Sequence, residues 1–277
     1  MKKGLSDAMF IPKWGAEKFL KLAKKAGFSG VELNFREDSG NITPKTPLSE
    51  ANKFAHLVGL YDLEIASLST GLFNHYSLSS NDPRLRKSGE EIGRRLIEFA
   101  AEMDVKIIKV VPGTITGDIS YGAAYENAVE SLIGLGEEAA TAGVTIGVEN
   151  VYNKFLPSPR EFVSFLDDIN HPYVKAYFDN GNALVTGYPE HFIELLGDRI
   201  VAMHVKDYRQ SIGSFVSILE GDTNWPAIMT ALQNISYKGY LISTPPYPYE
   251  YGHERHVERY AQDLTTILDL LIPEFNK

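Results

Sequence analysis

The sequence predicts a single (β/α)8 TIM barrel, an α/β fold that spans residues 1–277, and three features indicate it. Eight short runs rich in β-branched residues alternate with eight longer amphipathic segments. Glycine stands between several of the amphipathic segments and the run that follows, as at the left-handed end of a helix. No low-complexity linker interrupts the alternation, so no domain boundary is predicted.

The expected strands are short and apolar, which is typical of strands buried on both faces of a parallel sheet. The run KIIKVV at 106–111 shows this composition clearly. The strands are expected at residues 4–9, 30–35, 64–69, 106–111, 145–150, 174–179, 200–205 and 240–244.

The segments between these runs carry apolar residues at helical spacing. Arg95–Met103 places its apolar residues on one helical face, and Gly27, Gly59 and Gly143 stand at expected helix ends. The helices are expected at residues 16–26, 49–60, 83–103, 121–142, 158–169, 189–196, 225–235 and 253–271. An open doubly wound sheet also alternates, but it ranks second because the chain has eight units and no Gly-rich dinucleotide loop after the first run.

Composition narrows the function classes. A hydrophobic fraction of 44% and a charged fraction of 23% suit a globular protein with a sizeable core. The net charge of −9 and the dispersed basic residues disfavour nucleic-acid binding. The chain has no cysteine, which excludes disulfides and thiolate metal ligands and agrees with a reducing compartment. No run approaches the ~18 apolar residues of a membrane span, and no signal peptide is apparent at the start. We therefore expect a soluble cytoplasmic protein without a membrane partner.

Polar residues stand at the ends of three consecutive expected strands. The fifth strand ends in Glu149, the sixth in Asp179 and the seventh in His204. Parallel barrel strands point their C-terminal ends at one mouth, so these side chains should converge. Two carboxylates and one imidazole suit one divalent metal ion, Mg²⁺, Mn²⁺, Co²⁺ or Zn²⁺.

Such a site suits sugar carbonyl chemistry. A sugar with a carbonyl beside a hydroxyl chelates a metal, which polarises the carbonyl and stabilises an enediolate. A neighbouring carboxylate removes the proton and returns it elsewhere, which gives isomerisation or epimerisation. Singly, each residue has a plainer interpretation: Glu149 in a salt bridge, Asp179 in an Asx turn, and His204 as a buried histidine. The three positions at matching strand ends favour the metal site.

Six segments of the chain share the motifs of one enzyme family. They are AKKAGFSGVELN (23–34), ASLSTGLF (66–73), VTIGVENVYNKFLPSP (144–159), YFDNGNALVTGYPE (177–190), MHVKDY (203–208) and LEGDTNWPAIMTAL (219–232). With these motifs the chain resembles the sugar isomerase/epimerase group of the xylose isomerase-like barrels, over nearly its whole length. That group includes ketose 3-epimerases and hexulose- and pentulose-phosphate epimerases.

The resemblance implies a metal held by Glu149, Asp179 and His204, and proton transfer by Glu149. It further implies substrate contacts from Asn182 and Lys206, and a loop at EGDTNW that covers part of the mouth.

One position departs from the family pattern. Members carry a second metal-binding Glu at the end of the eighth strand, where this chain has Thr244 followed by two prolines. Threonine offers a neutral oxygen but no carboxylate base. Glu250 or Glu254 could replace the missing base, and His253 or His256 the missing ligand.

The sequence is compatible with four functions, in decreasing order of support. The leading hypothesis is a metal-dependent isomerase or epimerase of a ketose or ketose phosphate. The same enediolate could instead expel a hydroxyl, as in a dehydratase or lyase on a polyol-derived ketone, and Thr244 suggests a degenerate sugar-binding barrel with impaired catalysis. A DNA-repair endonuclease of the same superfamily ranks last, because the acidic chain lacks a basic groove.

Two further features of the sequence each have two interpretations. Gly113-Thr114 and the segment 211–214, with Lys154 or Arg209 adding charge, could bind a substrate phosphate, although such loops are also ordinary connectors. Aromatic residues at 73–76 and 246–251 could cover a sugar or form a homo-oligomer contact.

Overall fold

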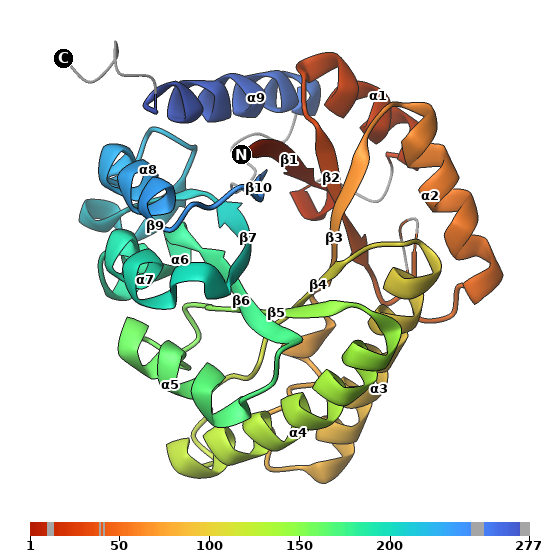
Figure 1. The fold of residues 1–277 in the computed structure, drawn as a ribbon, viewed down its shortest axis with the longest axis vertical. Coiled ribbons are helices and arrows are strands. Elements are labelled where there is room, and N and C mark those ends of the chain that lie inside the picture. The colour runs from red at the N-terminus through yellow and green to blue at the C-terminus, as the bar shows by residue number, and fades with distance from the viewer. Residues whose placement is uncertain (10–13, 39, 41, 245–251, 272–277) are drawn as a thin grey trace.

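Eight parallel strands close into a barrel, which confirms the predicted (β/α)8 fold (Figure 1). The computed structural model describes residues 1–9, 14–38, 40, 42–244 and 252–271. Around the barrel the order is β1-β10-β7-β6-β5-β4-β3-β2, so the first and last strands pair and close it. The barrel strands are β1 (Lys2–Ser6), β2 (Gly30–Phe35), β3 (Glu64–Thr70), β4 (Ile107–Val110), β5 (Thr145–Glu149), β6 (Val174–Asp179), β7 (Ile200–Val205) and β10 (Tyr240–Ser243).

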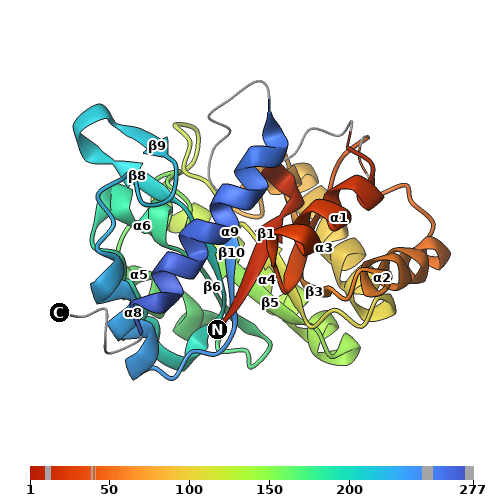
Figure 2. The ribbon, with the colours of Figure 1, turned by 90° about the horizontal axis from the view of Figure 1, so that it is seen from above.

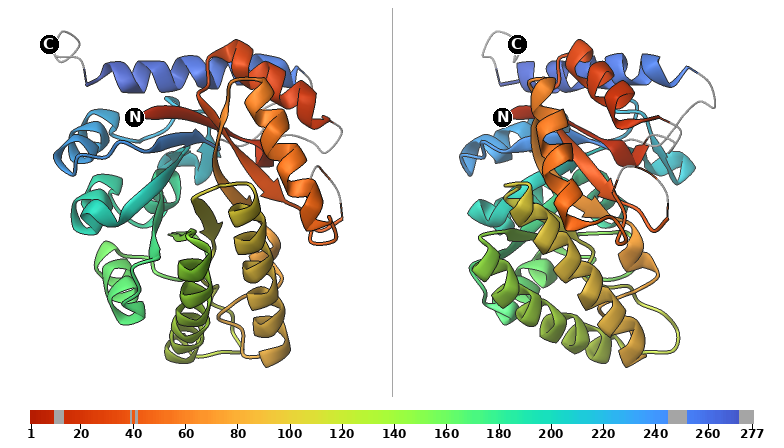
Figure 3. Two further views of the ribbon diagram at one scale, coloured as in Figure 1. Left: turned by 45° about the vertical axis from the view of Figure 1, so that its right-hand side comes forward. Right: turned by 90° about the vertical axis from the view of Figure 1, so that its right-hand side faces the viewer.

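Helices form a ring outside the strands, and α9 lies beside α1 where the barrel closes (Figure 3). The expected helices are all present, with ends within two residues of the predicted ones. They are α1 (Ala16–Ala26), α2 (Ala51–Leu60), α3 (Pro83–Glu102), α4 (Tyr121–Ala142), α5 (Pro159–Ile169), α7 (Pro189–Leu196), α8 (Trp225–Asn234) and α9 (His253–Asp269). None of the helices in the described ranges is long and apolar enough to cross a membrane.

The first strand lies earlier than predicted. It was expected at 4–9 but begins at Lys2, and a 3₁₀ turn (Asp7–Met9) follows Ser6. The backbone of Lys2 pairs with Tyr240 on β10 while its ammonium reaches Glu64 in solvent. The strand can begin with lysines because the pairing uses their backbone. The Lys2 side chain is exposed, and the Lys3 ammonium donates to Thr265 on α9.

Two of the three glycine caps are confirmed. Gly27 and Gly143 have φ of 86° and 66° and end α1 and α4 in the left-handed conformation. Gly59 is not a cap, because α2 continues to Leu60 and the left-handed residue that follows is Asp62. Aspartate tolerates this conformation, so the turn needs no glycine.

The core has two parts. A large apolar cluster joins the helices to the outer faces of the strands, and a small one contains Ala66, Tyr177, Ala202 and Ile242. These four residues come from β3, β6, β7 and β10, so they meet inside the barrel. They form an apolar layer in its interior, where polar side chains of β2, β3, β6 and β7 also bond to one another.

One α-helix and one β-hairpin were not predicted. A short helix α6 (Asn180–Thr186) follows β6, and an antiparallel hairpin of β8 (Asp207–Arg209) and β9 (Ser214–Val216) follows β7. The hairpin rises at the end of the molecule toward which the barrel strands run (Figure 2). Residues 211–214 include its turn, where Gly213 has a φ of 62°. The 219–224 loop is tied to the hairpin, because the carboxylate of Asp207 accepts from Thr223 N and the Tyr208 carbonyl accepts from Asp222 N.

Candidate metal centre

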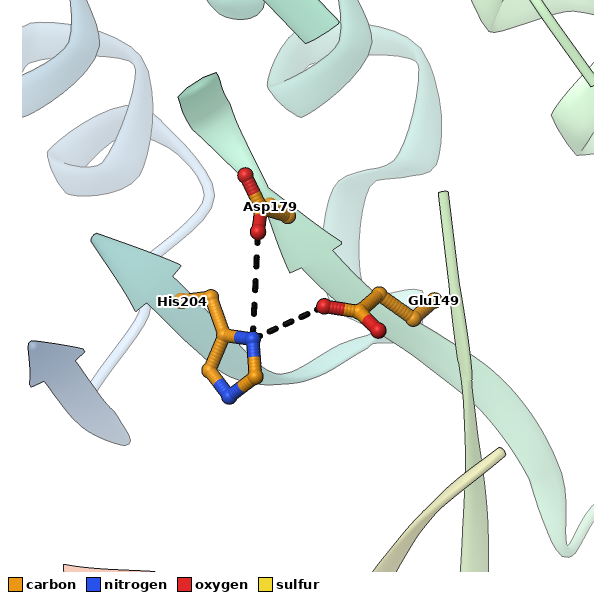
Figure 4. A group of neighbouring side chains, drawn as sticks. All are labelled: Glu149, Asp179 and His204. Atoms are coloured by element: carbon orange, nitrogen blue, oxygen red, sulfur yellow. Dashed lines mark hydrogen bonds and ion pairs between the residues drawn. The ribbon is translucent and has the colours of Figure 1, made fainter. Parts of the chain in front are cut away.

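Glu149, Asp179 and His204 lie together at the C-terminal ends of β5, β6 and β7 (Figure 4). His204 Nδ1 lies 2.8 Å from Glu149 Oε1 and 3.8 Å from Asp179 Oδ2. One potential ligand atom from each residue lies within 4.8 Å of the others, and all three side chains are buried. The predicted convergence is therefore present in the structure.

Asp179 uses its two oxygens differently. Oδ1 accepts a hydrogen bond from the backbone N–H of Asn182 at 2.8 Å and so caps α6. Oδ2 faces His204 and lies 3.1 Å from Lys206 Nζ. The FDNGN motif thus forms the turn that its composition suggests and still directs one carboxylate oxygen at the site. Asp179 therefore caps α6, and its role as a metal ligand stays a prediction that this arrangement permits.

Two asparagines fix the ends of β5 and β6. Asn150 Oδ1 accepts from Asp179 N at 2.8 Å, and its amide donates to the Asp179 carbonyl at 2.9 Å. The Asn182 amide nitrogen donates to the Asn150 carbonyl at 2.8 Å. Asn182 Oδ1 is buried and has no hydrogen-bond partner within the described part of the chain, so it is the atom of this residue left for a ligand.

Lys206 stands between the carboxylates and an aromatic group on the hairpin. Its ammonium lies 3.1 Å from Asp179 Oδ2 and 4.5 Å from the centre of the Phe215 ring. Tyr152, on the loop after β5, packs against Phe215 at 5.0 Å between ring centres and is more than half exposed. A cation held over an aromatic ring beside a carboxylate has a restricted position.

Two charged residues of the site were missed by the sequence analysis. Glu32 on β2 lies 3.0 Å from His204 Nε2, and Lys109 on β4 donates to Glu149 Oε2. Both are buried. The available signal was a charged residue inside a run expected to be buried on both faces, because buried charges need a partner.

The charges of this group control one another's pKa values. Burial disfavours the ionised form of Glu149, but Lys109 and His204 outweigh it and hold the pKa of that carboxyl well below its usual range. Burial also lowers the pKa of His204, and Glu32 and Glu149 overcome this and raise it to about 9. For Asp179 burial dominates and raises the pKa despite Lys206.

These residues fit a divalent metal by the chemistry of their donor atoms. Asp179 Oδ2 accepts no hydrogen bond within the described residues, although the Lys206 ammonium is near. Nδ1 of His204 faces both carboxylates, while Nε2 is occupied by Glu32. One imidazole nitrogen and two carboxylate oxygens are a common set for Mn²⁺, Co²⁺ or Zn²⁺.

The expected fourth position contributes no carboxylate. Thr244 is partly buried, its amide donates to the Val205 carbonyl, and its Oγ1 has no hydrogen-bond partner among the described residues. Among the candidate substitutes, Glu254 forms an ion pair with Lys18 at 2.7 Å and His256 stacks on Tyr260 within α9. Neither therefore replaces the missing group in this structure.

The remaining candidates are outside the site or outside the described residues. Glu250 and the His253 side chain lie outside the described parts, as does the aromatic segment 246–251. Lys154 is exposed on the loop after β5 with a φ of 70°, and Arg209 binds the Glu220 carbonyl. Their role toward a substrate phosphate stays a prediction.

A family model described as the xylose isomerase-like TIM barrel matches residues 20–268. The chain belongs to this family. The match covers β2 through most of α9, and so includes every strand that contributes to the metal centre.

Relatives of known name include epimerases. An L-ribulose-5-phosphate 3-epimerase of Escherichia coli is 25% identical over 228 residues, 80% of this chain and 80% of that protein. An uncharacterized protein of Methanocaldococcus jannaschii is 27% identical over 249 residues, 87% of this chain and 82% of its own length. The structure of D-psicose 3-epimerase with D-tagatose from Clostridium cellulolyticum H10 matches with a TM-score of 0.77 at 18% identity, covering 97% of both chains. A D-tagatose 3-epimerase-like protein gives a TM-score of 0.83 at 23% identity, covering 99% of this chain and 100% of that one. The two structures show the shared fold.

Proposed function

We propose that this protein is a metal-dependent isomerase or epimerase that acts on a ketose or a ketose phosphate. The observation that carries the proposal is the convergence of Glu149, Asp179 and His204 at the ends of three consecutive strands. Epimerases of ketoses and of a ketose phosphate among its relatives support the same reaction class.

Each residue of the centre has a task in this proposal. Glu149, Asp179 and His204 would hold one divalent ion, which would polarise the substrate carbonyl and stabilise the enediolate. Asn182 Oδ1 and the Lys206 ammonium would orient substrate hydroxyls. Asn182 Oδ1 is buried without a hydrogen-bond partner among the described residues, and Lys206 Nζ lies 3.1 Å from Asp179 Oδ2, which supports these roles.

Glu149 would move the proton. Its carboxylate would take the proton from the carbon beside the carbonyl and, in isomerisation, return it to the neighbouring carbon on the same face. Epimerisation would need a second group to return a proton to the opposite face of the first carbon. Lys109 holds Oε2, so the side chain is fixed while Oε1 faces the centre. A positioned base of this kind contributes about 10²–10⁴ to the rate.

Thr244 bears on whether the reaction is an epimerisation or an isomerisation. Two-base epimerisation uses carboxylates on opposite faces of one carbon, and Thr244 stands after β10, where the second of these carboxylates is expected. A reaction that returns the proton through a single base suffers less from this loss. We therefore infer that isomerisation is favoured over epimerisation, and the preference is checked by the ratio of the two products.

The test is exchange of substrate C–H protons with solvent. The protein is incubated in D₂O with Mn²⁺ or Co²⁺ and a panel of ketoses and ketose phosphates, and deuterium incorporation is followed by NMR and mass spectrometry. We expect metal-dependent incorporation without loss of mass, and we expect Glu149→Gln to abolish it. Absence of exchange with every sugar contradicts the proposal.

Two controls separate the alternatives. Asp167→Asn breaks an ion pair with Arg199 beside the N-terminal ends of β6 and β7, far from the mouth along the strands, and should leave exchange unchanged. A product lighter by one water indicates a dehydratase. Sugar binding by calorimetry without any exchange indicates a degenerate binding protein.

A further inference from the structure

Glu32 contacts the side of His204 that faces away from the other two candidate ligands. Its oxygens lie 3.1 Å and 3.0 Å from His204 Nε2, and its side chain is fully buried. Glu32 lies on β2 and His204 on β7, which are not neighbours in the barrel, so the contact crosses the interior. The carboxylate therefore contacts Nε2, the ring nitrogen that does not face Glu149 and Asp179.

Three donors from three other positions in the barrel fix the Glu32 carboxylate. Ser6 Oγ donates to Oε1 at 2.7 Å, Tyr177 OH donates to Oε2 at 2.7 Å, and Ser67 Oγ donates to Oε2 at 3.0 Å. The Tyr177 ring also packs edge-on against the His204 ring, with 4.7 Å between centres. Neither Glu32 nor His204 can rotate without breaking several of these buried contacts. Each broken hydrogen bond would cost free energy, because no water replaces the lost partner in the interior.

The two nitrogens of an imidazole cannot play the same role at a metal. The nitrogen that binds the ion must be unprotonated, and the other then carries the hydrogen. Nε2 faces Glu32, which only accepts, whereas Nδ1 faces Glu149 and Asp179. Those two carboxylates also only accept, so both nitrogens carry hydrogen in the metal-free protein. An ion held by Glu149 and Asp179 would replace the hydrogen on Nδ1, while Glu32 would keep the one on Nε2.

We propose that Glu32 is the positioning residue of the metal centre, which holds the His204 ring and its tautomer so that Nδ1 is the ligand atom. This inference rests on the proposed metal-dependent function and goes beyond it, because Glu32 itself touches neither ion nor substrate. A carboxylate behind a histidine ligand raises its basicity and orients it, and its loss typically costs 10- to 100-fold in metal affinity.

The experiment compares metal affinity in the whole protein by calorimetry with Co²⁺. Glu32→Gln should weaken Co²⁺ binding about 10- to 100-fold and change the visible absorption band of bound Co²⁺. The amide can donate to Nε2 and so permits the opposite tautomer. Tyr177→Phe, which removes one donor to Glu32 and keeps the ring, should weaken binding less.

Asp207→Asn is the matched control. It also neutralises a fully buried carboxylate after β7, but that carboxylate accepts from Tyr208 N on the hairpin and from Thr223 N on the 219–224 loop. Its Co²⁺ affinity should stay within about threefold of the parent protein, as expected for a group that does not position a ligand. The ¹⁵N shifts of the His204 ring in the Zn²⁺-loaded protein give a second readout, because they report which nitrogen carries the hydrogen.

The outcomes separate the two proposals. If the parent protein binds no Co²⁺, the proposed metal-dependent function fails and this inference fails with it. If the parent binds Co²⁺ and both Glu32→Gln and Tyr177→Phe bind it equally well with an unchanged spectrum, only the role of Glu32 is overturned. If Glu32→Gln does not fold, the Tyr177→Phe affinity and ring shifts decide alone, and values equal to the parent overturn the inference.

Discussion

At the scale of single residues, the centre is a buried group of balanced charges. Glu32, Glu149 and Asp179 face Lys109, Lys206 and the His204 imidazole, and each carboxylate lies against at least one cationic group. Buried charges are tolerated only when they are paired, so these six residues constrain one another. Changing one of them should affect both stability and metal binding.

Thr244→Glu should restore a fourth ligand. The new carboxylate enters beside a centre that already holds three donors, so Co²⁺ affinity should rise at least about tenfold. It also offers a second base, and we expect epimerisation to rise relative to isomerisation. Calorimetry and product analysis by NMR measure the two effects. Thr244→Gln introduces a side chain of about the same volume as glutamate but without a carboxylate base, so it should not change the product ratio. An unchanged affinity in Thr244→Glu would show that this position does not reach the metal.

Lys109→Met should destabilise the metal-free protein by about 3–5 kcal/mol, because it leaves the Glu149 carboxylate buried without its ammonium partner. A bound divalent cation would neutralise Glu149 again, so saturating Mn²⁺ should reduce the loss. Urea unfolding with chelator and with Mn²⁺ measures both values. Lys2→Met removes an exposed pair with Glu64 and should cost at most about 1 kcal/mol. Equal losses for the two variants would contradict this account.

Asp7 makes stability depend on pH. Burial raises its pKa to about 7 although Arg36 and Asn34 partly oppose the shift, and an unfolded Asp titrates near ~3.9. Because the folded pKa is the higher one, the contribution of Asp7 is fully present below about pH 4 and is lost as pH rises to about 7. The loss is on the order of 4 kcal/mol.

Asp7→Asn isolates this effect. The unfolding free energy of the parent minus that of the variant, measured in urea, should fall as pH rises from 5 to 7.5 and then level off. Other titrating groups cancel in the difference. A difference that stays constant over this range would mean that the Asp7 carboxyl is not held in its neutral form.

At the scale of elements, local signals set most boundaries. Ser158 is the N-cap of α5, and its hydroxyl accepts from the backbone N–H of Glu161 at 3.3 Å. Asn224 is the N-cap of α8 and its side chain accepts from Ala227 N. Most of the strands were predictable because they are short, rich in β-branched residues and separated by amphipathic segments, whereas β1, which begins with two lysines, was placed too late. The hairpin and α6 were missed because three-residue strands and an Asn-Gly-Asn helix start carry weak local preferences.

Ser158→Ala should lower the unfolding free energy by about 1 kcal/mol, since it removes the acceptor for one amide at the start of α5. Ser164→Ala, in the exposed middle of the same helix, should have the opposite sign, because alanine favours the helical conformation. Urea unfolding of the two variants measures the contrast, and a loss of equal size in both would argue against a capping role.

At the scale of the whole molecule, the candidate ligands come together only when the barrel closes. A metal that binds the folded state alone stabilises it by mass action, by about 2.7 kcal/mol at a free concentration of 100 times Kd. The free energy of unfolding measured with Co²⁺ at that concentration should exceed the value measured with chelator by this amount. Asp179→Asn keeps an oxygen to cap α6 but loses the charge, and it should remove most of the difference. A parent protein whose unfolding ignores Co²⁺ would contradict metal binding at this site.

The sequence by itself determined the alternation of strands and helices, and it placed Glu149, Asp179 and His204 at one rim, because parallel strands end on the same side. It could not bring Glu32 and Lys109 to them. Both lie inside their strands rather than at the ends, and Glu32 reaches His204 only across the interior of the closed barrel. That contact depends on the register of strands far apart in the chain, which local preferences do not set. Tertiary structure therefore decided which charges are paired, and local sequence decided which strand ends carry donors.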